Sequence, residues 1–414
     1  MNDPLRAQYE AFPYPPRDPE EEDRRLITGS PSHILEINHY IYAGRRDFTK
    51  SFRALIAGGG TGDAAIMLAQ HLDDAGAPGE VVYLDISSAS AGIAEARAAR
   101  RGLTNIRFVQ GSVDELAALG LGTFDYIDCC GVLHHLEEPG RALEALAGML
   151  AEDGGMGVMV YAPLGRTGVY HVQALLRMLT KDADDEERLA TARKLIGQLP
   201  PTNWLRRNPY VGDHLLSGDA GIYDLLLHSR ERAFTVPEAE ALVRKAGLRL
   251  VAFIEPVRYE PRLYLRDPAL VAKLDRFNWL ERCAFAEFLC GNFKTHVFYV
   301  VKATNREKTV AQPDTRDAVP MPVNLDGPAM AKAAKPGGVF KADIEGIKIA
   351  FPMPKLAPEI LKRLDGETSL GEIFEDMAKN SKKKLDWGTF IREFGQLYVL
   401  LSGMNLVFMR HPTG

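Results

Sequence analysis

Three glycines and one aspartate have the types and spacing of a nucleoside-binding site. Gly58, Gly60 and Gly62 occupy alternate positions of a short turn, and Asp85 ends the next apolar run, V-V-Y-L-D. Glycines let the backbone turn tightly and approach a ligand, and a carboxylate after the second strand can accept both hydrogen bonds of a ribose diol. The dinucleotide pattern G-x-G-x-x-G does not fit this turn. The residues therefore predict a site for a nucleoside rather than for a pyrophosphate.

A strand and a helix must hold this turn in place. Residues 54–57 form a continuous apolar run, which is typical of a strand buried on both faces. The helix after the turn directs its free N-terminal N–H groups back at the turn. From residue 52 to residue 162, apolar strands alternate with helices through short connections. This alternation predicts a doubly wound parallel α/β sheet with right-handed crossovers.

Four segments in this order resemble the class I S-adenosylmethionine-dependent methyltransferases. They are A-L-I-A-G-G-G-T-G-D, V-V-Y-L-D-I-S, F-V-Q-G-S-V-D-E-L and F-D-Y-I-D-C-C-G-V-L-H-H-L. The resemblance covers roughly residues 9–303 and implies a Rossmann-like sheet, the cofactor S-adenosyl-L-methionine and an antiparallel last strand at H-V-F-Y-V-V-K-A. A looser similarity, through P-Y-P-P-R, Y-A-P-L-G-R-T-G-V-Y and D-L-L-L-H-S-R-E-R-A-F-T-V-P-E, is to a subgroup that includes bacterial protein-lysine methyltransferases with a regulatory domain.

The family resemblance also implies which residues hold the cofactor. The glycine turn passes beneath its methionine part, Asp85 holds the ribose, Ile86 packs on the adenine, and the Cys130 carbonyl accepts a hydrogen bond from the ammonium group. The expected cofactor-binding residues are Gly58, Gly59, Gly60, Gly62, Asp63, Asp85, Ile86, Ser112, Val113 and Cys130.

One histidine and three tyrosines are candidates for the methyl-acceptor side. Methyl transfer from a sulfonium needs little acid–base chemistry, so alignment and exclusion of water are the expected tasks. His134 is the best catalytic candidate and its neighbour His135 is expected to brace the loop, with a structural role for both as the alternative. Tyr161, Tyr14 and Tyr223 are expected to close the acceptor pocket, with structural packing as the alternative role for each. The four cysteines match no zinc site and no disulfide framework, so no metal is expected.

The length of 414 residues is typical of two or three domains. The prolines of Y-E-A-F-P-Y-P-P-R-D-P favour an extended N-terminal arm. This arm either packs on the main domain or covers the cofactor pocket as a lid, and the resemblance to the methyltransferases implies the lid. The C-terminal helices and last strand suggest a small winged-helix-like α+β domain that serves protein contact or homodimer formation rather than DNA binding. The expected boundaries are an arm or lid at 1–50, a methyltransferase domain at 51–303 with inserts at about 163–235 and 257–294, a linker at 304–335 and the C-terminal domain at 336–414.

Composition gives no support to several other classes of function. The net charge of −5 and a pI near 6.1 argue against a nucleic-acid binder. No apolar signal region or membrane-spanning run is found, which predicts a cytoplasmic protein. The leading hypothesis is an S-adenosylmethionine-dependent methyltransferase with an unassigned acceptor, for which a protein lysine ranks narrowly ahead of a small molecule. Tyrosines and a carboxylate could help to remove the proton of such a lysine. The alternatives are a small-molecule methyltransferase and a noncatalytic S-adenosylmethionine-binding regulatory module.

Overall fold

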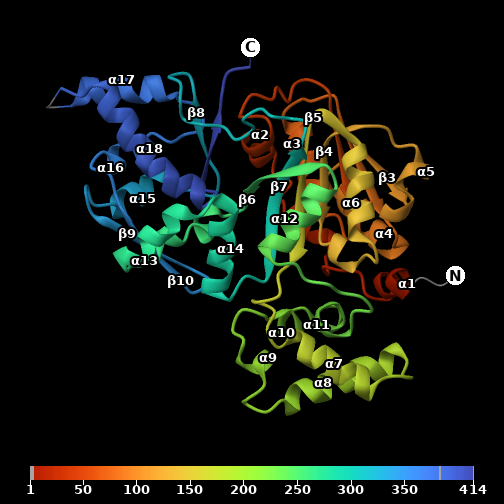
Figure 1. Cartoon of the computed structure of the whole chain (residues 1–414). Helices are drawn as coiled ribbons and strands as arrows, with labels where there is room; N and C mark the ends of the chain where they lie inside the picture. The colour runs from red at the N-terminus through yellow and green to blue at the C-terminus, as the bar shows by residue number, and fades with distance from the viewer. Residues whose placement is uncertain (1–3, 382–383, 414) are drawn as a thin grey trace. The chain divides into compact units, whose positions relative to one another are not determined.

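The computed structural model describes residues 4–381 and 384–413 (Figure 1). The chain divides into two units. Unit 1 contains the chain up to His33, Phe48–Leu250 and Gly291–Asn305. Unit 2 contains Ile34–Asp47, Val251–Cys290 and the chain from Arg306 onward. Each unit is described separately below.

A seven-stranded mixed sheet with the order β3-β2-β1-β4-β5-β7-β6 is the framework of unit 1. The strands β1 to β5 are parallel, and β7 runs antiparallel to β5. The Rossmann-like doubly wound sheet and the antiparallel strand near its edge are therefore confirmed. The strands are β1 Phe52–Ala57, β2 Gly79–Asp85, β3 Ile106–Gln110, β4 Phe124–Cys130, β5 Leu150–Tyr161, β6 Leu248–Phe253 and β7 Thr295–Lys302.

Helices between the strands cover the sheet and bury their apolar sides. Helix α3 packs against α4, and α6 packs against α12. Ser87 caps α4 by accepting a hydrogen bond from the Ser90 N–H group, and Pro139 opens α6, where a missing N–H group has no cost. The helices are α3 Asp63–Asp74, α4 Ser88–Arg100, α5 Leu116–Leu119, α6 Pro139–Gly148 and α12 Val236–Lys245.

The insert after β5 has an apolar core of its own. Figure 1 shows α7 and α8 side by side, and both pack against the π-helical segment Tyr223–Leu227. Buried residues of this core include Val172, Leu176, Leu189 and Tyr223. The helices of the insert are α7 Val169–Leu179, α8 Asp185–Gln198, α9 Trp204–Arg207, α10 Asp213–Leu216 and α11 Gly218–Ile222.

The N-terminal arm is partly helical, in contrast to the extended segment that its prolines favour. Helix α1, Pro4–Ala11, includes Tyr9, and a 3₁₀ turn spans Pro19–Asp23. The helix forms because Pro4 lies at its first position and the next proline comes only at Pro13. The arm in unit 1 ends at His33, because the residues of α2, Ile34–Ile41, belong to unit 2.

Unit 2 is assembled from three separate stretches of the chain. Residues 304–335, expected as a linker, include β8, α15 and the buried residues Ala311 and Ala318. Strand β11 pairs with β8, so residues 336–414 are not set apart as a domain, and their winged-helix character stays a prediction. The elements are α2, α13 Pro268–Lys273, α14 Trp279–Cys290, β8 Val319–Pro322, α15 Gly327–Ala333, β9 Val339–Ile344, β10 Ile347–Pro352, α16 Ala357–Leu361, α17 Leu370–Asn380, α18 Trp387–Gly403 and β11 Val407–Arg410.

We expect Gly62→Ala to lower the free energy of unfolding by about 1–3 kcal/mol, the range for an overpacked site or a strained backbone. Gly62 has φ +101°, and an added Cβ would lie 2.8 Å from the Ala94 Cβ atom. Urea unfolding followed by circular dichroism measures the change. Gly92→Ala is the control, because Gly92 lies in α4 with open space around it. Equal stability of the two variants would contradict this account of the turn.

Candidate active site

A cavity of about 430 Å³ lies at the carboxyl ends of β1, β2 and β4. This volume is within the range of small-molecule sites in proteins. All of its lining residues belong to unit 1, and they come from the arm, the carboxyl edge of the sheet and the last part of the insert. The cavity therefore lies where ligands bind in open α/β sheets.

The glycine turn and Asp85 form one hydrogen-bonded unit at this cavity. Asp85 accepts hydrogen bonds from the backbone N–H groups of Gly60 and Ser87, each at 2.8 Å. Burial raises the pKa of Asp85, and these backbone donors oppose the shift. Gly58 and Gly60 have φ of +78° and +50°, values that favour glycine. The carboxylate is thus fixed in position before any ligand binds.

All but one of the expected cofactor-binding residues line the cavity. The exception is Gly62, which faces Ala94 of α4 and serves packing between helices. Gly59 lines the cavity and must also lack a side chain for packing, because a Cβ there would lie 2.2 Å from the Tyr83 ring. The lining residues from the expected set are Gly58, Gly59, Gly60, Asp63, Asp85, Ile86, Ser112, Val113 and Cys130.

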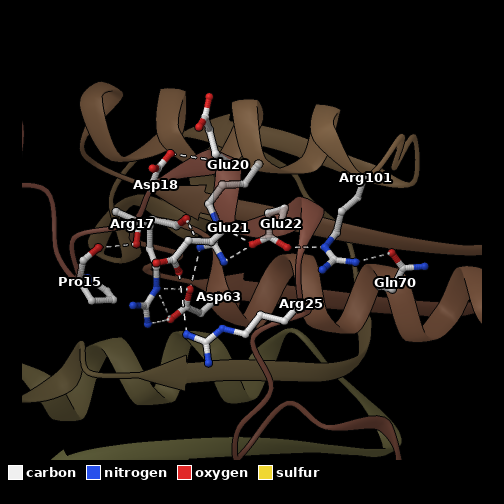
Figure 2. Close-up of polar contacts among 12 residues, drawn as sticks. Pro15, Arg17, Asp18, Glu20, Glu21, Glu22, Arg25, Asp63, Gln70 and Arg101 are labelled. Atoms are coloured by element: carbon white, nitrogen blue, oxygen red, sulfur yellow. Dashed lines mark hydrogen bonds and ion pairs between the residues drawn. The ribbon is translucent and has the colours of Figure 1, made fainter.

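Asp63 binds the arm, although it was expected to bind the cofactor. Figure 2 shows its carboxylate facing Arg17 of the arm, whose Nη2 atom lies 2.6 Å from Asp63 Oδ2. Arg97 Nη1 lies 2.7 Å from Asp63 Oδ1. Burial opposes ionisation of Asp63, but the hydrogen bonds from Arg17 and Arg97 outweigh it and lower its pKa. Asp63 therefore links the glycine turn to the arm.

A buried ion pair fixes the arm further along the chain. Glu22 has a fully buried side chain and lies 2.6 Å from Arg97, which is only 1% exposed. Arg101 donates a second hydrogen bond to the Glu22 carboxylate (Figure 2). Thr61 of the turn donates to the Pro15 carbonyl at 2.8 Å. These contacts hold Tyr14 and Pro15 at the cavity wall, and the role of the arm as a lid stays a prediction.

Asp224, which also lines the cavity, accepts hydrogen bonds from two tyrosines. Tyr161 donates to Oδ2 at 3.2 Å and Tyr9 to Oδ1 at 3.4 Å. His228 Nε2 lies 3.3 Å from the Tyr9 hydroxyl, and its Nδ1 accepts from the Arg230 N–H group. Burial raises the pKa of Asp224 to about 6. The carboxyl group is therefore mainly ionised at neutral pH.

The structure reverses the expected roles of the two histidines. His135 lines the cavity and His134 does not. His135 Nδ1 lies 3.0 Å from the Arg230 carbonyl, so it carries the proton and leaves Nε2 with a lone pair. Burial lowers the pKa of His135 to about 4, so the ring is neutral. His134 instead stacks on Tyr161 at 3.8 Å and accepts that residue's backbone N–H.

The three predicted tyrosines lie in two different environments. Tyr14 and Tyr161 line the cavity, as expected. Tyr223 does not, because its ring stacks on Phe12 at 4.6 Å and its hydroxyl meets Asp185 and Arg188. The prediction of Tyr223 as an acceptor-side residue is therefore wrong, since it belongs to the core of the insert.

Sequence reasoning missed Asp224 and Tyr9 as residues of this site. Asp224 stands in the apolar run G-I-Y-D-L-L-L, where a buried carboxylate needs a specific reason. A charged residue within an apolar run was therefore the signal in the sequence that could have indicated Asp224. Tyr9 offered none, because nothing near it in sequence indicates contact with a residue of the insert.

His135, Asp224 and His228 could hold a metal ion by distance alone, since their ligand atoms lie within 4.8 Å of one another. The hydrogen bonds favour a proton-bearing network instead. His228 Nδ1 accepts a hydrogen bond from the Arg230 N–H group, which places the proton on Nε2, where it points to Tyr9. The rings of His135 and His228 also stack at 3.7 Å, an arrangement unsuited to two ligands of one ion.

The strand order, the glycine turn with Asp85 and the adjoining cavity together define a class I methyltransferase fold. A family profile described as "Methyltransferase domain" matches residues 55–156. Residues 55–156 therefore belong to a methyltransferase domain, and the sheet has the class I methyltransferase fold, a class whose cofactor is S-adenosyl-L-methionine. The expected methyltransferase domain and Rossmann-like fold are confirmed.

Two proteins are similar to this chain in sequence, and one solved structure is similar to it in fold. An uncharacterized protein of Synechococcus sp. is 33% identical over 286 residues, which are 67% of this chain and 65% of that protein. A ubiquinone biosynthesis O-methyltransferase of Cronobacter sakazakii is 25% identical over 142 residues, 33% of this chain and 54% of that enzyme. The structure of PKMT2 from Rickettsia typhi in complex with AdoHcy aligns with a TM-score of 0.61 at 13% identity, over 100% of this chain and 78% of that chain.

Coverage of these relatives is partial: the match spans 65% of the Synechococcus protein and 54% of the O-methyltransferase.

Within the part of the chain that the structure describes, no helix combines the length and the apolar character needed to cross a membrane.

We expect Asp85→Ala to weaken the binding of S-adenosylhomocysteine by roughly 1.5–3 kcal/mol, the scale of a hydrogen bond to a charged group. The substitution removes the carboxylate at the turn that we expect to accept hydrogen bonds from the ribose hydroxyls. Titration calorimetry measures the affinity, with Asp153→Ala, an exposed position on β5, as the control. Unchanged affinity in a folded Asp85→Ala protein would mean that the ribose binds elsewhere.

Proposed function

We propose that this chain transfers the methyl group of S-adenosyl-L-methionine to the side-chain amine of a protein lysine. The observation that carries this proposal is the buried carboxylate of Asp224, which lines the cavity between two tyrosine hydroxyls. A buried carboxylate beside aromatic rings attracts an ammonium group through its charge and through the negative faces of the rings. A neutral hydroxyl acceptor gains less from both features.

Asp224 also gives the proton of the acceptor a destination. The bound cofactor supplies a methyl group on positively charged sulfur, and the C–S bond breaks as the C–N bond forms. An ammonium has no lone pair, so it must first lose a proton, which the Asp224 carboxylate accepts. Tyr9 and Tyr161 keep this carboxylate oriented, and Tyr14 helps to exclude water from the reacting atoms.

Two further observations support a lysine acceptor. The segments of the arm and insert resemble a subgroup that includes bacterial protein-lysine methyltransferases, and they supply Tyr14, Tyr161 and Asp224 to the cavity. The fold similarity to PKMT2 extends over the whole chain. By contrast, the similarity to the O-methyltransferase covers only 33% of the chain, so it says little about the acceptor side.

The acceptor can be identified by incubating the protein and methyl-labelled cofactor with lysate from a strain that lacks the gene. We expect label on a protein lysine, found by mass spectrometry, and a loss of about 10²-fold or more in kcat with Asp224→Asn, the range for removal of a general base. Asp182→Asn, an exposed position in the insert, is the matched control.

Other outcomes of this experiment have definite meanings. Label confined to small molecules would replace lysine with a small-molecule acceptor. Bound cofactor without any transfer would favour the noncatalytic regulatory module. Full activity of Asp224→Asn would contradict its role as the base.

The pH dependence of turnover follows from the same carboxyl group. Burial raises the pKa of Asp224 from its ordinary value of 3.8 to about 6, so the group is neutral below this pH and charged above it. Because the charged form accepts the proton, kcat at saturating cofactor should rise as pH increases through about 6 and then level off. Asp224→Asn should remove this step from the profile. A kcat that falls with rising pH across this range would contradict the assignment.

A further inference from the structure

A third buried carboxylate lines the cavity, besides Asp85 and Asp224. Asp128 is 2% exposed and lies beside Ile56 in the parallel register of β4 and β1, and both residues line the cavity. The proposed reaction uses neither its charge nor its hydrogen-bonding capacity. A buried ionisable group at a ligand cavity requires a physical reason.

Two hydrogen bonds hold the Asp128 carboxylate in place. Ser32 Oγ donates to Oδ2 at 2.5 Å, and the Cys130 N–H group donates to Oδ1 at 3.1 Å. Ser32 is 1% exposed, and the carbonyl of the preceding Pro31 accepts a hydrogen bond from Tyr126 at 2.8 Å. The sheet therefore fixes the donor as well as the acceptor. Each carboxylate oxygen retains the capacity to accept another hydrogen bond.

No protein cation balances this charge. Among residues 4–381 and 384–413, no basic side chain forms an ion pair with Asp128. Burial raises the pKa of Asp128 to about 6, against the opposing effect of the bonds from Ser32 and Cys130. A carboxylate in this environment is stabilised strongly by a cation that enters the cavity.

The sheet order determines which end of the cofactor reaches Asp128. Asp85 ends β2, and Ser112 and Val113 follow β3, on the side of β2 away from β4. A nucleoside with its ribose at Asp85 and its base toward Val113 must extend its remaining end over β1 and β4. In S-adenosylmethionine this end is an amino acid with an ammonium and a carboxylate group. The Asp128 carboxylate attracts the ammonium group and repels the carboxylate group.

We propose that Asp128 binds the ammonium group of the cofactor's amino-acid end, directly or through one ordered water, with Ser32 as its positioning residue. The inference rests on the proposed function only through the shared cofactor and does not depend on the identity of the acceptor. It makes this part of the cavity selective for ligands that retain a free amine.

Three ligands distinguish this role from its alternatives. S-adenosylhomocysteine has the ammonium and no sulfonium, S-adenosylmethionine has both, and 5′-methylthioadenosine has neither. We expect Asp128→Asn to weaken the binding of the first two by about tenfold to hundredfold, the range of a hydrogen bond to a charged group. Affinity for methylthioadenosine should stay within about twofold. Asp125→Asn, on the same strand and outside the cavity, is the matched control.

Each other outcome overturns the proposal. Weakening of S-adenosylmethionine alone would assign Asp128 to the sulfonium, and equal weakening of all three ligands would make its role structural. Tighter binding of S-adenosylhomocysteine would place the ligand carboxylate at Asp128. If the wild-type protein failed to bind S-adenosylhomocysteine at all, the cofactor assignment itself would be wrong. If the protein bound the cofactor but transferred no methyl group, only the proposed acceptor would be contradicted.

Ser32→Ala provides a second test that leaves the carboxylate in place. It removes the donor to Oδ2, so it should weaken S-adenosylhomocysteine several-fold and leave methylthioadenosine unaffected. Circular dichroism and the urea midpoint show whether each variant is folded. Equal affinities of Ser32→Ala and wild type for S-adenosylhomocysteine would contradict the positioning role.

Discussion

The free-energy cost of removing three carboxylates from water is the constraint on which this cavity depends. Asp85, Asp128 and Asp224 are all buried, and burial raises the pKa of each. Such groups remain in a fold only where donors satisfy them. Those donors come from separate parts of the chain: the glycine turn, the arm segment with Ser32, Tyr9 of α1 and the end of β5. Satisfying the carboxylates therefore brings these segments to one cavity.

The position of the glycine turn and Asp85 at one cavity could be predicted because its determinants are local. The glycines and Asp85 are adjacent to strands with clear apolar patterns, and the strand–turn–helix geometry leaves little freedom in where they lie. The acceptor half depends on details that a pattern does not contain. His134 and His135 lie in one 3₁₀ turn, in which successive side chains point in different directions, so the sequence could not show which one reaches the cavity.

The domain boundaries show the same limit on a larger scale. Composition separated residues 304–335 as a linker, yet Ala311 forms a backbone hydrogen bond to His39, and β8 pairs with β11. Tyr40 likewise donates a hydrogen bond to Asn405, across most of the length of the chain. Pairings between such distant stretches leave no periodic signal in the sequence. They are fixed by tertiary packing, which overrides local propensity.

Tyr161 is held between two flat groups. The Arg166 guanidinium lies 3.7 Å over its ring and the His134 ring is stacked at 3.8 Å, and two groups so close must occupy opposite faces. A half-turn of the ring about its own axis would drive its edges into both groups, so the sandwich opposes that motion. The phenolic oxygen lies on that axis and would stay where it is even in a completed half-turn. The two flat neighbours and the symmetry of the side chain thus both keep the hydroxyl on Asp224.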